Sequence, residues 1–139
     1  MDQVIVFGTG VVAYGVIDEC ARAGLRIIHL TTKRDDIAAQ SSHIDERAYV
    51  EFVAVSEADI LGHFLASADR WKGSLLLPVN DRQVVFVSRH IEALSEHFRC
   101  GFPPWTAWSR YSSFRDRFRP FNSARGNLRW WRPTARRPW

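Results

Sequence analysis

Short apolar runs alternate with amphipathic stretches along the first hundred residues of the chain. Val4–Phe7 is a continuous apolar run, typical of a strand buried on both faces of a parallel sheet, and it ends at Gly8-Thr9-Gly10. Apolar positions at helical spacing follow from Val11 to a stop at Gly24. Arg26–Leu30 is the next apolar run. The short loop before this run predicts a parallel βαβ unit with a right-handed crossover.

The alternation continues to residue 102. The remaining predicted elements are a loop with a short helix over Thr31–Ser42, a strand over Tyr49–Val55, a helix opened by a Ser56–Asp59 capping box with an apolar stripe up to Ala68, a strand over Leu75–Leu77, a helix capped by Asn80-Asp81 that runs to Leu94, and a strand over Phe98–Phe102. This order predicts a doubly wound, mostly parallel α/β sheet of the Rossmann-like kind, with helices on both faces.

The composition of the chain changes at Cys100 and Gly101. Residues 1–100 carry ten Lys and Arg against fourteen Asp and Glu, a net charge of −4, whereas residues 101–139 carry nine Arg and one Asp, a net charge of +8. The second part also holds five of the six Trp but no Val or Ile, so it lacks a periodic core pattern. We therefore expect a domain over residues 1–104 and an irregular, poorly packed basic tail over residues 105–139.

Several classes of protein are disfavoured by the sequence. Cys20 and Cys100 are too few for a disulfide framework, and the five His form no spaced ligand pair, so we expect no metal site. No run approaches the roughly 20 apolar residues of a membrane span, and Met1-Asp2-Gln3 does not open a signal sequence. These features predict a cytoplasmic protein that does not bind membranes.

The turn after the first strand matches a dinucleotide-binding motif. Gly8-Thr9-Gly10-Val11-Val12-Ala13 fits G-x-G-x-x-G/A, in which N–H groups at the helix start attract a phosphate. The end of the second strand lacks the usual acidic residue but offers Lys33 and Arg34, which suit a 2′-phosphate. One hypothesis is thus an NADP-type site of Gly8, Gly10, Ala13, Lys33 and Arg34. We prefer the alternative of a packing turn, which is a common use of such glycines.

Four segments in order carry a family resemblance: Val4–Gly10, Cys20–Ile28, Leu76–Asp81 and Val87–Leu94. Together they resemble the N-terminal domain of the ATP-grasp carboxylate–amine ligases, over about residues 3–104. The resemblance implies a Rossmann-like domain that forms the substrate side of a cleft for a small carboxylate or amine. By resemblance the substrate-binding residues are Gly8, Thr9, Gly10, Asn80 and Asp81.

The same resemblance bears on activity. In that family, two later domains bind ATP and Mg²⁺ and activate a carboxylate as an acyl phosphate for attack by an amine. The tail offers one carboxylate, Asp116, whereas phosphoryl transfer needs several metal-binding carboxylates and cationic phosphate clamps. We therefore expect a fragment that needs no cofactor of its own and is inactive as a ligase when alone.

The tail departs from the family after Pro103-Pro104. Trp105-Thr106-Ala107-Trp108 must be encoded as TGG-ACN-GCN-TGG, and the frame one base earlier reads Leu/Met/Val, Asp, a residue such as Gly or Ser, and Leu/Met/Val. This pattern suits the helix opening of the family and favours out-of-frame translation of the tail. The alternative is a nucleic-acid-binding arm of Arg interleaved with Phe and Trp. The charge alone predicts weak, salt-sensitive, non-specific binding to nucleic acid.

Overall fold

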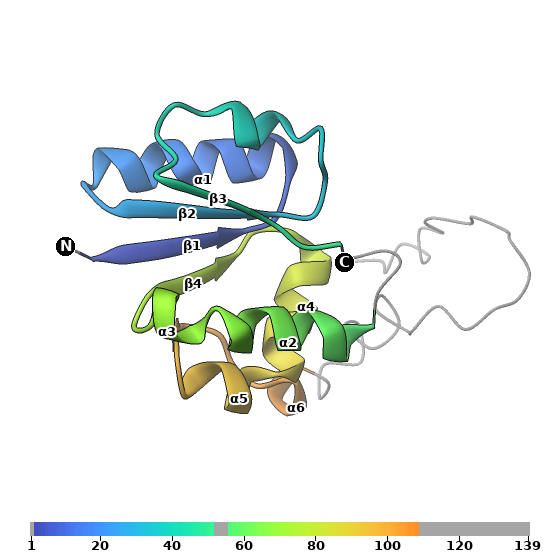
Figure 1. Cartoon of the computed structure of the whole chain (residues 1–139). Helices are drawn as coiled ribbons and strands as arrows, with labels where there is room; N and C mark the ends of the chain where they lie inside the picture. Colours follow the sequence, from blue (N-terminus) through green and yellow to red (C-terminus); the bar gives the residue numbers. More distant parts are fainter. Residues whose placement is uncertain (1, 52–55, 109–139) are drawn as a thin grey trace, which may run out of the picture.

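The computed structural model describes residues 2–51 and 56–108, which form one five-stranded parallel sheet (Figure 1). The strands are β1 Gln3–Phe7, β2 Arg26–Thr31, β3 Glu46–Tyr49, β4 Leu75–Pro78 and β5 Arg99–Cys100. Their order is β3-β2-β1-β4-β5, and every neighbouring pair is parallel. The predicted doubly wound α/β fold is confirmed.

Helices cover both faces of the sheet (Figure 1). One face carries α1 Gly10–Arg22 and the 3₁₀ helix η1 Ile37–Gln40, and the other carries α2 Glu57–Ala66, α3 Ala68–Trp71, α4 Asp81–Arg89, α5 Ile91–Ser95 and α6 Trp105–Trp108. In the described part of the chain the longest helix has 13 residues, and none is long and apolar enough to cross a membrane.

The apolar run of β1 is explained by its position in the middle of the sheet. Val4 and Val6 belong to the core cluster under α1, whereas Ile5 and Phe7 belong to the cluster on the opposite face. In the second cluster the rings of Phe7 and Phe64 lie 5.1 Å apart between their centres, in an edge-to-face arrangement. Because side chains alternate along a strand, a strand with two buried faces must be apolar throughout.

The third strand was predicted at the wrong place. β3 covers Glu46–Tyr49, so the predicted strand over Tyr49–Val55 overlaps it at Tyr49 alone, and residues 52–55 lie outside the described residues. The reason is that β3 is an edge strand, paired with β2 on one side. Such a strand has room for the charged side chains of Glu46 and Arg47, and its sequence therefore lacks the apolar signal of a central strand.

Several helix predictions are refined by the structure. The Ser56–Asp59 capping box is present at the start of α2. The helix predicted from Asn80-Asp81 to Leu94 is interrupted at His90, which separates α4 from α5. Two positions of the predicted apolar stripes, Val12 and Leu65, are exposed by 58% and 41%. The predicted fifth strand is shortened to the two residues of β5.

The first residues of the predicted tail form a helical turn. α6 lies against α4, where the guanidinium carbon of Arg89 is 4.9 Å from the centre of the Trp105 ring. The predictions of an irregular tail, of nucleic-acid binding and of a shifted reading frame concern mainly residues 109–139, which lie outside the described residues.

Phe64 provides a test of this core. It is fully buried and packs against Phe7, Phe86 and Phe98, whereas the next residue, Leu65, is 41% exposed. We expect Phe64→Ala to lower the free energy of unfolding by about 3–5 kcal/mol, because it removes a large buried ring and leaves a cavity. Leu65→Ala, the control, should cost less than about 1 kcal/mol. Urea unfolding measures both changes. Equal losses of unfolding free energy in the two variants would contradict the assignment of Phe64 to the buried face of α2 and Leu65 to its exposed face.

Candidate functional site at the glycine turn

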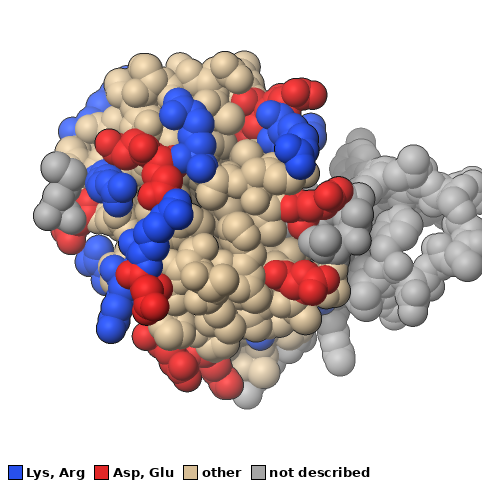
Figure 2. Space-filling view, in the orientation of Figure 1, with Lys and Arg blue, Asp and Glu red and all other residues tan. Residues whose placement is uncertain are grey.

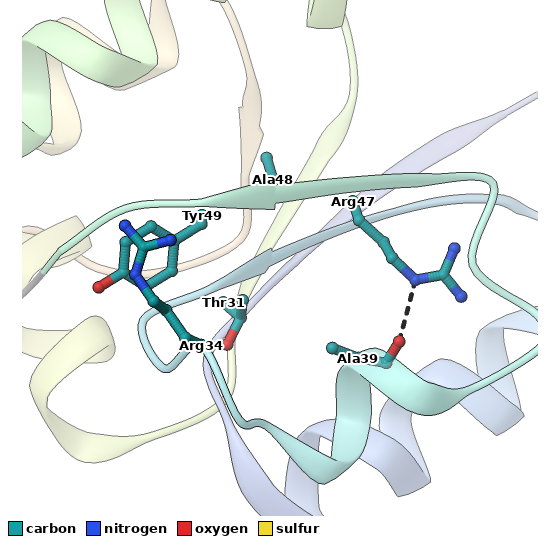
Figure 3. Close-up of a pocket in the computed structure, with 6 residues that line it drawn as sticks. All are labelled: Thr31, Arg34, Ala39, Arg47, Ala48 and Tyr49. Atoms are coloured by element: carbon teal, nitrogen blue, oxygen red, sulfur yellow. Dashed lines mark hydrogen bonds between the residues drawn. The ribbon is translucent and has the colours of Figure 1, made fainter.

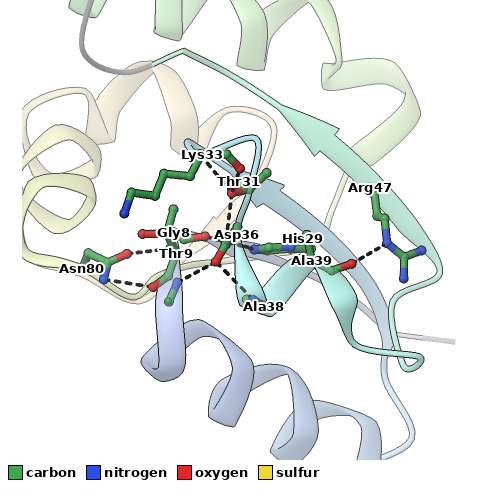
Figure 4. A network of polar contacts seen from close by, with 11 residues as sticks. Gly8, Thr9, His29, Thr31, Lys33, Asp36, Ala38, Ala39, Arg47 and Asn80 are labelled. Atoms are coloured by element: carbon green, nitrogen blue, oxygen red, sulfur yellow. Dashed lines mark hydrogen bonds and ion pairs between the residues drawn. The ribbon is translucent and has the colours of Figure 1, made fainter.

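The candidate site lies where the order of the strands reverses, between β1 and β4. In open α/β sheets ligands bind at the carboxyl ends of the strands beside such a switch point. Here the turn after β1, Gly8-Thr9-Gly10, meets Asn80, the second residue after β4 (Figure 4). Asn80 Oδ1 accepts a hydrogen bond of 2.7 Å from the Thr9 N–H, and Asn80 Nδ2 donates one of 3.3 Å to the Thr9 carbonyl. The two loops are therefore joined by a two-way amide contact.

The close approach of these loops requires glycine at position 8. A Cβ atom added to Gly8 would lie 2.3 Å from Asn80 Oδ1 and 2.4 Å from Val79 Cγ2, which no real Cβ tolerates. The φ angle of Gly8 is 150°, a region that other residues rarely adopt. The first glycine of the motif is thus needed for packing between β1 and β4, independently of any ligand.

A buried carboxylate accepts a hydrogen bond from the backbone N–H group at the start of α1. Asp36 is only 2% exposed, and its Oδ1 accepts hydrogen bonds from the N–H groups of Gly10 at 2.8 Å and Ala38 at 3.1 Å. Its Oδ2 accepts one from the Thr31 hydroxyl at 2.8 Å. A negative charge is favourable at a helix N-terminus. The place that the motif offers to a phosphate therefore holds a side chain of the protein itself.

His29 lies beneath this carboxylate and is fully buried. Its Nε2 is 3.0 Å from the Gly8 carbonyl oxygen and 3.5 Å from Asp36 Oδ2, and its Nδ1 has no partner among the described residues. Burial lowers the pKa of His29, and the nearby Gly8 carbonyl and Asp36 carboxylate oppose that shift without reversing it. The neutral ring, with its proton on Nε2, supports the glycine turn by donating to the Gly8 carbonyl.

The predicted substrate-binding residues largely come together. Gly8, Thr9, Gly10 and Asn80 share the contacts above, and Asp81 is exposed as the first residue of α4.

The residues predicted only for an NADP-type site do not lie together. Ala13 belongs to α1 and is fully buried on the face of the helix that packs on the sheet. Lys33 and Arg34 are exposed on the loop after β2, and the Arg34 guanidinium stacks on Tyr49 instead of approaching the turn.

Two residues of the site were not identified from the sequence. Neither Asp36 nor His29 was assigned a role in the turn from the sequence. Asp36 accepts from Ala38 two residues on and caps η1, a local pattern that Asp favours. Its bond to Gly10, 26 residues earlier, depends on the path of the loop and leaves no local signal.

Other reactive groups give no second centre. Burial raises the pKa of both Cys20 and Cys100, so their thiols stay protonated at neutral pH. Within residues 2–51 and 56–108, no three His, Cys, Asp or Glu side chains gather in a group that would hold a metal ion. On the face in Figure 2, basic and acidic side chains lie side by side instead of forming a field of one sign.

No protein-family model matches this chain, and a comparison with curated proteins finds no significant match. The roles of the site residues are therefore argued from geometry.

Replacing Gly8 tests the contact between the two loops. We expect Gly8→Ala to destabilise the protein by about 1–3 kcal/mol, because the new methyl group meets Asn80 and Val79. Gly15→Ala is the control: Gly15 lies inside α1 with nothing within 4 Å of an added Cβ, so the change should stabilise by about 0.5–1 kcal/mol. Urea unfolding measures both effects, and a neutral Gly8→Ala would show that the approach of the loops is not tight.

The pH dependence of stability tests the state of His29. Because its pKa is lowered from the ordinary value of 6.5, the unfolded chain binds more protons than the folded chain below that pH. The free energy of unfolding should therefore fall as the pH drops through 6.5. His29→Gln keeps an N–H donor without titrating and should reduce the slope by up to about 1.4 kcal/mol per pH unit. A residual slope from His63, whose pKa is also lowered by burial, should persist. Equal slopes in both proteins would refute a neutral buried His29.

Proposed function

We propose that this domain is the substrate-side N-terminal domain of an ATP-dependent carboxylate–amine ligase. The observation that carries the proposal is the occupation of the glycine turn by protein side chains. Asp36 accepts a hydrogen bond from the Gly10 N–H, and Asn80 accepts one from the Thr9 N–H. Neither N–H group is therefore free to bind a pyrophosphate. Such a turn disfavours a dinucleotide lying across it, and it suits a domain that binds a small molecule beside the turn.

The polar groups beside the glycine turn suit a small charged substrate. Asp81 provides an exposed carboxylate at the start of α4. Figure 4 shows the Lys33 side chain extended on the side of the turn where Asn80 lies. A substrate amine would be attracted by Asp81 and a substrate carboxylate by Lys33, because opposite charges attract at this partly exposed edge. An amino acid or a related small carboxylate fits this pair of charges.

The described residues do not fit the ATP–Mg²⁺ part of such a reaction. In-line phosphoryl transfer needs metal-binding carboxylates and phosphate-binding cations on one cleft. No group of metal-ligating side chains occurs in the part of the chain that the structure describes. In this proposal the domain binds and orients one substrate, and the nucleotide is handled by other polypeptide segments.

An NADP-type binding module is the second candidate, and it is less well supported. It requires the N–H groups of the turn for the pyrophosphate, and the Gly10 N–H is held by a carboxylate with two further hydrogen bonds. Removing Asp36 from that position would leave its charge without partners in a buried place, which is costly. We therefore place the dinucleotide hypothesis second.

A thermal-shift screen of the 139-residue chain tests the two candidates. We expect an amino acid or small carboxylate to raise the melting temperature, since a ligand present at 100 times its Kd stabilises the folded state by about 2.7 kcal/mol. NADPH should give no comparable shift, and no phosphate should be released from ATP with amines and carboxylates. Strong stabilisation by NADPH alone, or turnover by the purified chain, would contradict the proposal.

Two substitutions locate the binding. Asp81→Asn should weaken binding of the stabilising amine without lowering stability, because no hydrogen bond of the described structure depends on Asp81. Asp69→Asn is the matched control, since Asp69 is also an exposed acidic residue in the first turn of a helix, α3. Equal affinities in the two variants would place the ligand elsewhere.

A further inference from the structure

A pocket distinct from the glycine turn opens beside the edge strand β3, and its volume is about 270 Å³. It is lined by Thr31, Arg34, Ala39, Arg47, Ala48 and Tyr49. Figure 3 shows Arg34 and Tyr49 at one end, Arg47 at the other, and the two alanines on opposite sides between them. Ala39 has a short side chain that leaves the space open, whereas the Ala48 side chain points to the opposite face of the sheet and packs against the core cluster of Phe7 and Phe64. Its volume suits a molecule at the small end of ordinary ligands.

Both basic residues of this pocket lack an acidic partner. Among the described residues, most arginines form an ion pair with Asp or Glu: Arg22, Arg26, Arg70, Arg89 and Arg99. Arg34 and Arg47 have no carboxylate within the 4.0 Å of such a pair in this part of the chain. The neighbouring acid Glu46 is engaged by Arg26, Arg70 and Trp71. Two positive charges therefore flank one small space, and among the described residues neither is paired with a carboxylate, although Arg47 donates to the carbonyls of Ala39, Ile44 and Ser41.

Each guanidinium is held in place before any ligand arrives. The Arg34 guanidinium carbon lies 4.5 Å from the centre of the Tyr49 ring, a stacking contact that uses its flat face and leaves its N–H edge available. Arg47 donates to the Ala39 carbonyl at 2.9 Å and to the Ser41 carbonyl at 2.7 Å. Fixed donors lose little conformational entropy on binding, which favours affinity.

We propose that this pocket binds a small organic dianion, a phosphate monoester or a dicarboxylate. Its acidic group pairs with the N–H edge of Arg34, and the rest of the molecule lies along β3 over Ala39, towards the positive charge of Arg47. Hydrogen bonds between a guanidinium and a carboxylate or phosphate are short and strong, and they are frequently bidentate. This inference is independent of the ligase proposal, since it concerns the other side of β2.

The test uses amide chemical shifts of the ¹⁵N-labelled full-length chain, because the arginines of the tail would dominate any bulk binding signal. Inorganic phosphate, succinate and 2′-AMP are titrated separately. We expect saturable shifts at Thr31, Ala39 and Ala48 with at least one probe, and weaker binding at higher salt. A response to 2′-AMP but not succinate identifies a phosphate monoester, and the reverse identifies a dicarboxylate.

Two variants and a control decide the location. Arg34→Gln should weaken binding about tenfold or more by removing the charged donor. Ala39→Leu keeps both arginines but fills the space, and it should weaken binding to a similar extent. Arg22→Gln removes the same charge from an exposed position on α1 and should leave the Kd within twofold. Absence of saturable shifts with all three probes, or an unchanged Kd in either pocket variant, would overturn the proposal.

Discussion

The buried carboxylate of Asp36 is the interaction on which the architecture around the glycine turn depends. It joins β2, α1 and η1 through the Thr31 hydroxyl and the N–H groups of Gly10 and Ala38. Burying a charge is costly unless hydrogen bonds compensate for it, and here three donors do so. The same group satisfies an N–H that the start of α1 would otherwise leave without a partner. One carboxylate therefore both stabilises the turn and occupies the hydrogen-bonding position of the Gly10 N–H.

The glycine turn and the pocket beside β3 are neighbours across β2. Thr31 lines the pocket, and its hydroxyl donates to Asp36, which in turn holds Gly10. Burial is the main cause of the lowered pKa of His29, and the positive charge of Arg47 on the pocket side lowers it further. The positive charge of Arg47 therefore acts on His29 across β2.

The parts of the fold that were predicted from sequence are those whose surroundings leave a local pattern. β1, β2 and β4 are central strands, and burial on two faces makes them apolar throughout. β3 was predicted at the wrong place because an edge strand does not have to be apolar throughout. In the site, the glycines were identified through a recurrent turn pattern, and Asn80 was assigned to it through the family resemblance. The side chain of Asn80 makes no cap hydrogen bond to α4 and contacts Thr9 instead. The roles of Asp36 and His29 depend on contacts with residues more than 20 positions away in the sequence. The spacing of apolar residues along the chain does not predict such contacts.

The last strand of the sheet ends where the composition of the chain changes. β5 stops at Cys100, and among the described residues every member of the two core clusters lies before Gly101. Mutations within residues 101–108 therefore escape the strongest selection that a fold imposes, which acts on buried apolar positions. A change of reading frame beyond Pro104 would leave the packed interior of the sheet intact, and such a change would persist in a gene more easily than one a few dozen codons earlier.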